Sequence, residues 1–443
     1  MFPTTRRRNA APATRRATAP LVTALTTTLA TALVSATTVG MLGLAPSAHA
    51  AKAKAKSRTL PTATVLTTKS FDSTAQLAKG TTSGTTVANG SVKLKSPKKI
   101  RTIAGNRYRT GTWTSPWVNT KTFTELLPSW QATTPGHSLV QIQVRVKKAD
   151  GTTGSWDTLA RWTSQNDGVL NGSQAYARKS WTRQSDDLAS IATDTVVVND
   201  RAAGATGWQV RVELMRRAGT TDRPVLHRVG ASASEVIARR TTSKPGKVAR
   251  AGIVLDVPRL SQMTHAGHYP QYGNGGEAWC SATSVAMVLE YYGANPAEAH
   301  AYSPVLNGRA HTDGVVDFTA RAVYDHAYRG TGNWGFNTAY AGTLLRKTRV
   351  HRLPHLKSAE KYLAAGTPLI VSVAFGKGQL SGAPISATPG HLMVLIGFTP
   401  DGDVIVNDPA AKTNDQVRRR YDRAQFEKAW LSRSGGLTYV MED

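Results

Sequence analysis

The sequence of 443 residues predicts an all-β region followed by an α+β region. In the middle of the chain, apolar and polar residues alternate, which is typical of strands with one buried face. After residue 250, helical patterns come first and apolar strand-like runs come later, an order that favours an α+β domain. The length allows more than one domain.

Residues 1–50 have the pattern of a secretory signal peptide. Five arginines precede a stretch without charge, residues 17–48, and the small-x-small cleavage signature Ala48-His49-Ala50 closes it. An uncleaved membrane anchor is the alternative, but the many threonines and Pro20 disfavour insertion. We therefore expect cleavage after Ala50 and a secreted mature chain, free or held at the cell wall, without an integral membrane segment.

Two stretches have the composition of connecting segments. Residues 51–95 are rich in Lys, Thr, Ser and Gly and have little apolar periodicity, which predicts a basic flexible tether. Residues 238–250 are basic and contain Pro245-Gly246, which predicts a linker between two domains. These segments leave one domain over residues 96–237 and another over residues 251–443.

Residues 96–237 are expected to form a β-sandwich. The runs 140–146 and 208–214 alternate strictly between apolar and polar residues. Turn signals separate the runs and no convincing helix interrupts them, as in a sandwich of ordinary size. Seven of the ten tryptophans lie in this region. Large aromatic residues usually fill a core and its rim, and a sugar- or wall-binding face is the alternative.

The chain has a net charge of +27, and nearly all of it lies before residue 251. Residues 251–443 hold 18 Lys and Arg against 16 Asp and Glu, whereas the whole chain holds 55 and 28. The basic N-terminal part therefore favours anionic cell-envelope polymers or an anionic surface as a partner. We expect no specific nucleic-acid partner.

Residues 251–443 are expected to combine helices and strands. Helical patterns cover residues 280–292, 315–328 and 357–365. Apolar runs typical of strands cover residues 369–374, 392–398 and 404–406. The run Arg418-Arg419-Arg420 is interpreted as a solvated edge.

The chain has one cysteine, Cys280, at the start of a predicted helix. A structural cysteine in an exported protein needs a partner, and the chain has no second cysteine. The free N–H groups and the positive dipole end of a helix start favour the thiolate, and the glycines before Cys280 let the backbone approach a substrate. A catalytic nucleophile is one interpretation, and a small buried apolar residue is the other.

A second feature brings an imidazole toward a carboxylate. His391 opens the run 392–398 and Asp408 follows the run 404–406, with an Asp-Gly turn between the two runs. This pattern predicts an antiparallel hairpin centred between Pro400 and Asp401. His391 then lies opposite position 410, and Asp408 is within diagonal reach. Such a pair supplies the base and the orienting group that a nucleophile requires.

Four segments occur in a characteristic order: Leu260-Ser261-Gln262, Ala278-Trp279-Cys280-Ser281-Ala282-Thr283-Ser284 with Met287-Val288-Leu289, Gly390-His391-Leu392-Met393-Val394-Leu395-Ile396-Gly397-Phe398, and Val406-Asn407-Asp408-Pro409-Ala410. Together they resemble papain-like cysteine peptidases of the bacteriocin-processing type, family thirty-nine of the cysteine peptidases, in their secreted, free-standing actinobacterial form. The resemblance runs from Val254 to the C-terminus, a reasonable length for one domain. The middle region resembles the β-rich segment that precedes such domains.

The resemblance implies a papain-like fold and a role for each of four residues. Cys280 matches the nucleophile, His391 the general base and acid, Asp408 the residue that orients the imidazole, and Gln262 the oxyanion donor. From the residues alone, Gln262 is only a loop residue with a suitable amide. The gap from Gln262 to Cys280 is longer than in transporter-linked members, and the sequence has no transporter segment, so processing of double-glycine leaders is not implied.

The sequence gives no reason to expect a cofactor or a metal. His265 and His268 lie in a Gly-Tyr-Pro loop, Pro354 prevents a helical pair of His351 and His355, and no companion ligand can be placed.

The expected function is hydrolysis of peptide bonds in a peptide or protein substrate, by a secreted cysteine peptidase that forms a thioester acyl-enzyme. The same residues also support amidase or acyl-transfer chemistry, and the sequence does not separate these activities. The alternative from another class is an inactive cell-envelope-binding protein that grips peptides without cutting them.

Overall fold

A computed structural model describes residues 65–165, 174–182, 184, 187–235, 242–302, 304–306 and 309–443. The chain divides into Met1–Lys56 and Ser57–Asp443, and the second unit holds all the described residues. The expected signal peptide, residues 51–64 of the expected tether and residues 238–241 of the expected linker lie outside the described residues.

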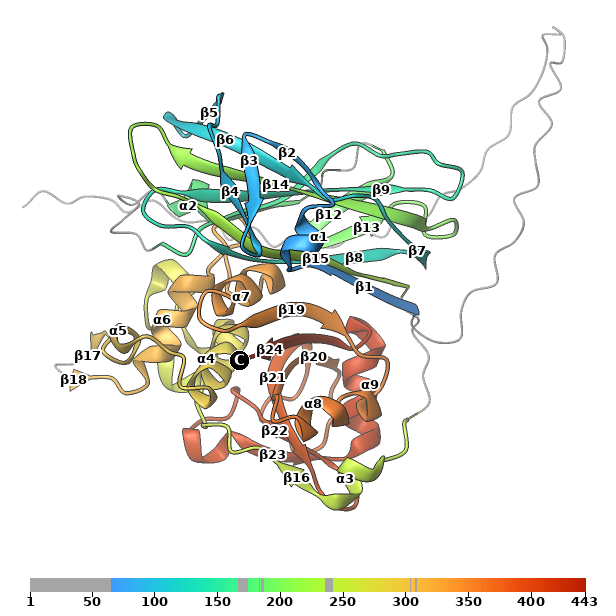
Figure 1. Cartoon of the computed structure of the whole chain (residues 1–443). Helices are drawn as coiled ribbons and strands as arrows, with labels where there is room; N and C mark the ends of the chain where they lie inside the picture. The colour runs from blue at the N-terminus through green and yellow to red at the C-terminus, as the bar shows by residue number, and fades with distance from the viewer. Residues whose placement is uncertain are drawn as a thin grey trace, which may run out of the picture. The chain divides into compact units, whose positions relative to one another are not determined.

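The region before residue 236 consists almost entirely of strands (Figure 1). They pair antiparallel in one 15-stranded sheet, and two short helices interrupt them. In chain order the elements are β1 (Val65–Phe71), α1 (Thr74–Leu77), β2 (Thr81–Ser83), β3 (Thr85–Ala88), β4 (Ser91–Leu94), β5 (Lys99–Ile103), β6 (Asn106–Thr114), β7 (Val118–Phe123), β8 (Glu125–Thr133), β9 (Leu139–Lys147), β10 (Asp157–Trp162), α2 (Gln174–Ala177), β11 (Lys179–Thr182), β12 (Ala189–Thr193), β13 (Thr195–Val198), β14 (Ala205–Arg217) and β15 (Val225–Glu235).

Alternation of apolar and polar residues explains these strands. β9 and β14 pair so that Val144 lies opposite Val210 and Ile142 lies opposite Val212. All four side chains are fully buried. Because successive side chains of a strand point to opposite faces, the apolar residues of both strands face one core. The strands predicted for the two alternating runs are confirmed.

The two halves of the 15-stranded sheet close on one core. The sheet order is β2-β6-β14-β9-β10-β11-β12-β13-β8-β15-β4-β3, with β1 on β15, β5 on β6 and β7 on β14. β11 pairs with β10 on one side and with β12 on the other, so it links the two halves. One buried cluster contains Trp113 and Trp208 from the first half and Trp130 from the second.

The seven tryptophans of this region fall into two groups. Four are fully buried: Trp113, Trp130, Trp162 and Trp208. Three are half-buried with cationic side chains over their rings: Trp117, Trp156 and Trp181. Core filling therefore accounts for the first group, as the sequence predicts, and the second group stacks with arginine and lysine at the rim.

Part of the expected tether lies in strands. β1 pairs with β15 over its whole length, with Phe71 opposite Val229, and β2, β3 and β4 lie in the same segment. The composition conceals these strands because they are held by hydrogen bonds at the sheet and contribute few buried apolar side chains, among them Phe71 and Val92. Threonine, which is abundant here, also favours extended backbone.

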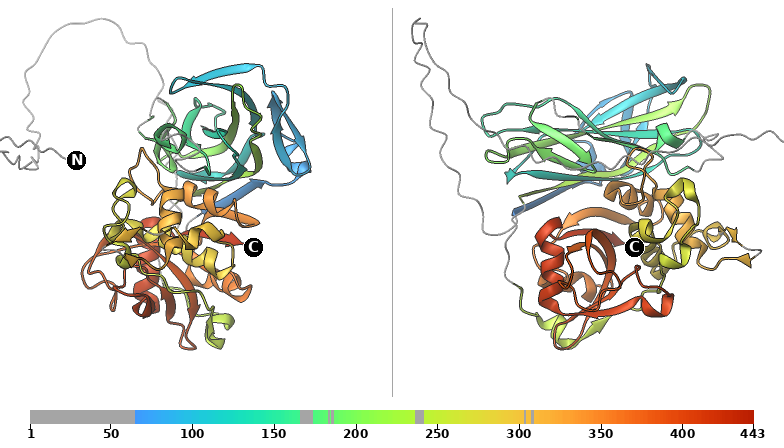
Figure 2. Two further views of the ribbon diagram at one scale, coloured as in Figure 1. Left: turned by 90° about the vertical axis from the view of Figure 1, so that its left-hand side faces the viewer. Right: turned by 180° about the vertical axis from the view of Figure 1, so that it is seen from behind.

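The region after residue 241 combines helices with a second sheet (Figure 2). Its helices are α3 (Lys247–Ala251), α4 (Cys280–Tyr291), α5 (Ala297–His300), α6 (Gly314–Val323), α7 (Trp334–Ala341), α8 (Glu360–Ala364) and α9 (Arg423–Ser434). Its short 3₁₀ turns are η1 (Met263–His265), η2 (Pro270–Tyr272), η3 (Gly276–Trp279), η4 (Leu356–Ser358) and η5 (Asn414–Gln416). Its strands are β16 (Ile253–Val254), β17 (Val305–Leu306), β18 (Arg309–Ala310), β19 (Lys347–Arg352), β20 (Leu369–Phe375), β21 (Thr388–Phe398), β22 (Val404–Asn407), β23 (Arg418–Tyr421) and β24 (Leu437–Glu442).

The second sheet supports helix α4 and so fixes the place of its N-terminus. The sheet order is β19-β24-β20-β21-β22-β23, with β16 on β21. α4 packs on β21, where the Ser284 hydroxyl donates to the Leu392 carbonyl at 3.3 Å. The predicted helix at 280–292 and the three predicted strands are confirmed, and so is the α+β class. Among the described residues no helix has the length and apolar character needed to span a membrane.

The helix predicted for residues 315–328 is shorter than expected because Asp325 ends it. α6 stops at Val323. The Asp325 carboxylate accepts the backbone N–H groups of Ala327 at 3.0 Å and Tyr328 at 3.2 Å. A carboxylate that binds nearby backbone N–H groups competes with the helix for them.

The predictions from the sequence do not include the two longer helices α7 and α9, nor the short helices α1, α2, α3 and α5. Each of the two longer helices begins at a capping residue: the Asn333 side chain accepts the N–H of Phe336, and the Asp422 side chain accepts the N–H of Gln425. The arginine run before α9 forms β23, the edge strand of the sheet. The caps were therefore visible in the sequence, but the run of charge beside α9 concealed the helix.

The expected linker is partly bound to the C-terminal region. The backbone N–H of Ser243 donates to Glu427 at 2.6 Å, and that of Gly246 donates to Glu360 at 2.7 Å. Residues 242–250 are therefore anchored by carboxylates of α9 and α8 and do not form a free connection.

Hydrogen bonds and an ion pair join the 15-stranded sheet to the C-terminal region. The Gln131 amide donates to the carbonyl of Leu345 at 3.3 Å. The Arg352 guanidinium lies 2.7 Å from the Glu125 carboxylate, and Leu127 belongs to the core cluster of the C-terminal region. The two regions thus share buried contacts.

Candidate active site

Cys280 is the first residue of α4, directly after the 3₁₀ turn η3. Two glycines shape the approach: Gly275 has a φ of 62° and Gly276 a φ of 52°. A Cβ atom at Gly275 would lie 1.7 Å from the carbonyl oxygen of His265, so no other residue fits there without moving the backbone. The glycine-rich run therefore fixes the start of the helix that carries the thiol.

The surroundings of Cys280 favour its thiolate. Burial by itself raises the pKa of the thiol, but the hydrogen bond and the charge of His391 more than offset it. Backbone N–H groups of Leu392 and Ser281 add to this effect, so the pKa of Cys280 lies below its ordinary value. Cys280 is half-buried and free of any disulfide. A thiolate with access to a cavity is a nucleophile.

His391 lies on β21 with its ring between Cys280 and Asp408. Its Nε2 lies 2.7 Å from Oδ1 of Asp408, which leaves Nδ1 for the hydrogen bond with the Cys280 thiol. Burial by itself lowers the pKa of His391, but the Asp408 carboxylate and Cys280 more than offset it and raise that pKa above its usual range. The two shifts together favour an imidazolium beside a thiolate.

Asp408 is buried and bound on both oxygens. Oδ1 accepts the backbone N–H of Ala410 at 3.0 Å, and Oδ2 accepts the hydroxyl of Tyr421 at 2.7 Å. Burial by itself raises the pKa of this carboxyl, but the charge and hydrogen bond of His391, with the Tyr421 hydrogen bond, hold it below its usual value. The carboxylate can thus fix the imidazole in one orientation.

The hairpin register explains how His391 meets Asp408. β21 and β22 pair with Val394 opposite Asn407 and Leu395 opposite Val406. Continued by three residues, this register sets His391 opposite position 410, as the turn predicted. A bulge between Leu395 and Gly397 shifts the pairing only on the turn side. The proximity that we expected for the imidazole and the carboxylate is found.

Gln262 lies beside this group of residues and is buried. Its backbone N–H donates to the carbonyl of Pro409 at 2.9 Å, and its side-chain Nε2 donates to the carbonyl of Gly276 at 3.0 Å. These bonds connect the turn after Asp408 to the turn before Cys280. Gln262 therefore joins the two segments that carry the thiol and the carboxylate, although sequence reasoning placed it only in a loop.

Sequence reasoning missed Tyr421. This residue ends β23, directly after the arginine run, and its side chain is fully buried. The available signal was an aromatic residue that closes a run of charge at the edge of the sheet. The arginine run favoured a solvated interpretation of the whole segment, whereas the Tyr421 hydroxyl points inward to Asp408.

Cys280 opens into a cavity of about 690 Å³. Its walls come from η3, the turn after α6, the start of α7, β20, the start of β21 and α9, and they include Tyr328, Trp334, Ser372, Pro389 and Arg433.

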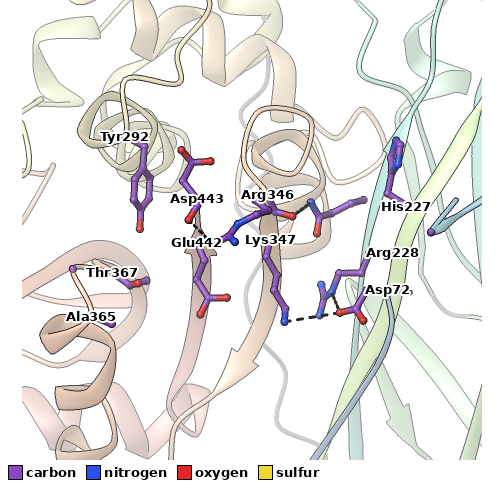
Figure 3. Close-up of a pocket in the computed structure, with 13 residues that line it drawn as sticks. Asp72, His227, Arg228, Tyr292, Arg346, Lys347, Ala365, Thr367, Glu442 and Asp443 are labelled. Atoms are coloured by element: carbon purple, nitrogen blue, oxygen red, sulfur yellow. Dashed lines mark hydrogen bonds and ion pairs between the residues drawn. The ribbon is translucent and has the colours of Figure 1, made fainter. Parts of the chain in front are cut away.

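A second cavity, of about 740 Å³, lies far from this chemistry (Figure 3). Figure 3 shows Arg228 and Lys347 directed at Asp72, which they approach at 3.6 Å and 3.9 Å. Its wall residues include no cysteine, and two of its cationic side chains are directed at one carboxylate. We therefore assign the candidate active site to the smaller cavity, because that one contains the activated thiol.

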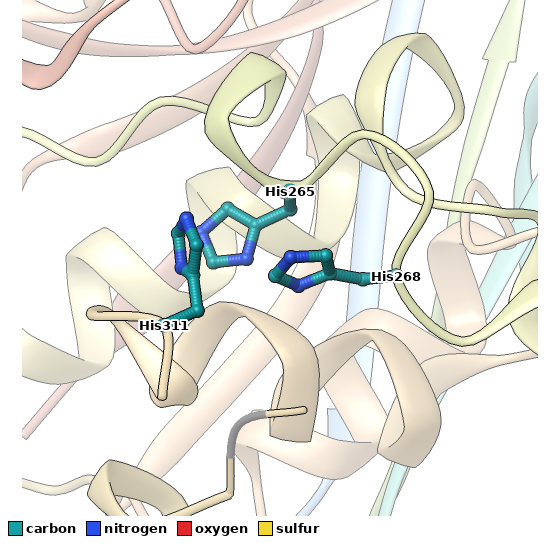
Figure 4. Close-up of side chains that lie close together, drawn as sticks. All are labelled: His265, His268 and His311. Atoms are coloured by element: carbon teal, nitrogen blue, oxygen red, sulfur yellow. The ribbon is translucent and has the colours of Figure 1, made fainter. Parts of the chain in front are cut away.

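A group of three histidines, His265, His268 and His311, could hold a metal ion (Figure 4). It lies outside the cavity wall that contains Cys280. Among the described residues no other group of this kind is found.

The chain matches two family models. Residues 67–234 match a Peptidase C39 N-terminal domain of actinobacterial type, and residues 254–437 match the Peptidase_C39 like family. No curated protein matches this chain.

Three solved structures show weak similarity. "Structure of PfGH50B" has 14% identity and a TM-score of 0.18, covering 47% of this chain and 33% of that chain. An exo-beta-agarase has 11% identity and a TM-score of 0.16, covering 52% of this chain and 32% of that one. The agarase AgWH50C has 10% identity and a TM-score of 0.14, covering 47% and 33%. The aligned part spans about a third of each of those proteins, and similarity at this level carries no argument.

Proposed function

Because the chain belongs to the C39-like peptidases of the actinobacterial type, we propose that it is a cysteine peptidase that hydrolyses peptide bonds with Cys280, His391 and Asp408. One observation carries the proposal. A continuous series of hydrogen bonds runs from the thiol through the imidazole to the buried carboxylate. A lone thiol without a catalytic role has no need of such partners.

The proposed reaction begins with the Cys280 thiolate. Its sulfur forms a bond to the scissile carbonyl carbon, and the tetrahedral intermediate collapses as His391 gives its proton to the leaving amine. The C–N bond breaks and a thioester remains. Neutral His391 then takes a proton from water as the water oxygen attacks the thioester, and breakage of the C–S bond regenerates the thiolate with the imidazolium. Atoms and protons balance without a cofactor.

Gln262 is the proposed donor to the oxyanion, together with the backbone N–H of Cys280. One amide N–H of Gln262 is used by the carbonyl of Gly276, and a primary amide has a second. The position of Gln262 between the two catalytic segments supports this role. Donors fixed before the reaction stabilise negative charge without reorganising.

The finer architecture is also a proposal. We propose that the C-terminal region is papain-like, with the nucleophile at the start of α4 and the base on the facing sheet. We propose further that the 15-stranded sheet is a β-sandwich accessory domain. The first is supported by α4 packed on β21, and the second by a core shared between two halves of one sheet.

Export and envelope binding are proposed from the sequence. The uncharged stretch before Ala50 supports cleavage there, and N-terminal sequencing of protein from culture medium should then begin at Ala51. The excess of positive charge before residue 251 supports binding to anionic envelope polymers. Intact precursor retained in the membrane would contradict the first of these proposals.

The decisive experiment labels the purified mature protein with an electrophilic peptidase probe and maps the adduct. The label should reach Cys280, and digestion of a mixed peptide library should release new N-termini. Cys280→Ser should abolish labelling and cleavage without unfolding the protein. Labelling with release of ammonia or acyl transfer in place of new N-termini would assign an amidase or transferase. Absence of labelling in folded protein would leave an inactive binding protein.

A further inference from the structure

Three imidazoles converge between the loop before α4 and the segment before α6. One ring nitrogen from each of His265, His268 and His311 lies within 4.8 Å of the other two. The ring centroids are 5.1 Å, 4.9 Å and 4.6 Å apart. Figure 4 shows the rings grouped around a common point, although His311 is far from the other two along the chain.

One carboxylate holds two of the rings. Nδ1 of His265 lies 3.0 Å from Oδ2 of Asp317, and Nδ1 of His268 lies 2.7 Å from Oδ1 of the same residue. Asp317 is fully buried on α6. A carboxylate accepts hydrogen bonds, so both Nδ1 atoms carry the proton and both Nε2 atoms present a lone pair.

His311 presents the same nitrogen for a different reason. Its Nδ1 lies 2.6 Å from the backbone carbonyl of Thr312, which can only accept. Nδ1 therefore carries the proton here too, and Nε2 keeps its lone pair. A ligating histidine almost always donates its other N–H to a carboxylate or a carbonyl, and all three rings do so.

A second observation points to a ligand. Nε2 of His265 is buried and has no hydrogen-bond partner among the described residues, and the whole residue is 0% exposed. An acceptor nitrogen shut away from water without a partner is costly. If the rings served only to bind Asp317, nothing would compensate this nitrogen.

We propose that one divalent transition-metal ion of the zinc type binds to His265, His268 and His311. Asp317 holds two of the three rings in place through hydrogen bonds. Three neutral imidazoles with an open fourth position suit zinc in tetrahedral coordination. Zn–N distances of about 2.0–2.1 Å require the three ligand nitrogens to lie closer together than 4.8 Å, the distance within which one nitrogen of each ring is found, so metal binding requires the rings to approach one another. His311 is half-buried, in a segment outside any helix, and can make that movement.

The ion would tie the loop between Gln262 and Cys280 to α6. The N–H of His265 donates to the carbonyl of Gln262 at 3.1 Å, and the His265 ring lies 6.2 Å from that of Trp279. This chain has one cysteine and thus no internal disulfide. A metal would give an exported protein a crosslink of another kind, and this inference does not depend on the proposed peptidase activity.

The test uses the full mature protein without a histidine tag, in a Cys280→Ser background so that no thiolate can bind the ion. Chelator-treated protein is titrated with Co²⁺, whose visible absorption reports tetrahedral coordination, and zinc content is measured after dialysis. We expect one equivalent of metal, displacement of Co²⁺ by zinc and a higher Tm with zinc.

Two substitutions and a matched control locate the ion. His311→Ala removes a half-buried ligand outside regular structure and should lower affinity by more than 100-fold. Asp317→Asn should lower it by about 10–100-fold, as is usual for groups that orient a ligand. His300→Ala, an exposed histidine of the same region, should leave affinity and the zinc-induced rise in Tm unchanged.

Equal metal affinity in His311→Ala and His300→Ala would overturn the proposal. So would the absence of a zinc effect on the Tm of the folded parent, or metal bound only when Cys280 is present. In that case the rings serve as hydrogen-bond partners of Asp317 alone.

Discussion

The hydroxyl of Tyr421 donates to Oδ2 of Asp408 at 2.7 Å, on the oxygen that His391 does not use. The carboxylate is thereby hydrogen-bonded on both oxygens, to an imidazole on β21 and to a phenol on β23. Since β22 lies between these strands in the sheet, the sheet itself sets the distance between the two partners.

Tyr421→Phe should lower the free energy of unfolding by about 1.5–3 kcal/mol at neutral pH, because it removes one hydrogen bond to a buried charge. The pKa of Asp408 is depressed in the folded state, so this stabilisation exists above the unfolded pKa of about 3.9 and is lost as pH falls through the folded value. Urea unfolding at several pH values measures it. A deficit that stays constant down to strongly acidic pH would contradict the assignment.

Alkylation of Cys280 by iodoacetamide should persist well below the usual thiol midpoint of about 8.5, because the pKa of the thiol is lowered mainly by His391. His391→Ala should move the midpoint up toward the free-thiol value, since burial is then opposed only by the backbone N–H groups of Leu392 and Ser281. Rates measured by mass spectrometry between pH 4 and pH 10 decide the matter. A parent profile identical to that of His391→Ala would mean that no ion pair forms.

Gln262→Ala should reduce kcat by roughly 10²–10³ if the amide stabilises the oxyanion. KM should change little, because the oxyanion develops only in the transition state. Gln262 also bonds the carbonyl of Gly276, so the structural contribution must be separated. Thermal unfolding of the variant and its Cys280 alkylation profile are the controls. A loss of rate that follows a shifted alkylation profile would indicate displacement of Cys280 and no oxyanion role.

Binding to anionic envelope polymer should depend on exposed lysines of the β-rich region. Replacing Lys93, Lys95, Lys98 and Lys99 by Gln should weaken binding and its salt dependence, because exposed charges act within about 10 Å at 0.1 M salt. The matched control replaces four exposed lysines of the C-terminal region, Lys357, Lys377, Lys412 and Lys428. Equal losses in both quadruple variants, measured by sedimentation with cell walls, would show that only net charge matters.

Glu125→Gln should lower the free energy of unfolding by about 3–5 kcal/mol, because it removes the carboxylate that neutralises the buried Arg352 guanidinium, which then keeps hydrogen bonds only to the uncharged groups of Ser234 and Ser434. Glu125 lies on β8 and Arg352 on β19, so the loss should appear in the unfolding of both regions. Differential scanning calorimetry shows whether one transition or two shift. If calorimetry shows two transitions and the substitution lowers the Tm of only one of them, the two regions unfold separately.

The sequence predicted best where local pattern and burial agree. The strands of β9 and β14 and the hairpin of His391 follow from alternation and turn chemistry, which act over a few residues. The strand register that the turn fixes also predicted that His391 lies near Asp408, because a register determines which residues of the two strands face each other. Cys280 at a helix start was visible for the same reason.

Features that depend on contacts between residues far apart in the sequence could not be predicted from the sequence. The strand β1 is polar and is defined by its pairing with β15. Tyr421 reaches Asp408 only because β23 lies beside β22. His311 joins His265 and His268 through the packing of α6, whereas the sequence beside these two histidines offers no third ligand. In each case the deciding partner lies outside the window that a local pattern covers.

Gly275 couples the position of the histidine cluster to the position of the segment that carries Cys280. A side chain there collides with the backbone carbonyl of His265, which no change of rotamer relieves. The carbonyl belongs to a residue of the histidine cluster, and five residues after Gly275 comes Cys280. Any substitution at this position therefore moves both at once. The point of contact has room only for a hydrogen atom, so this one position constrains both the histidine cluster and the segment that carries the thiol.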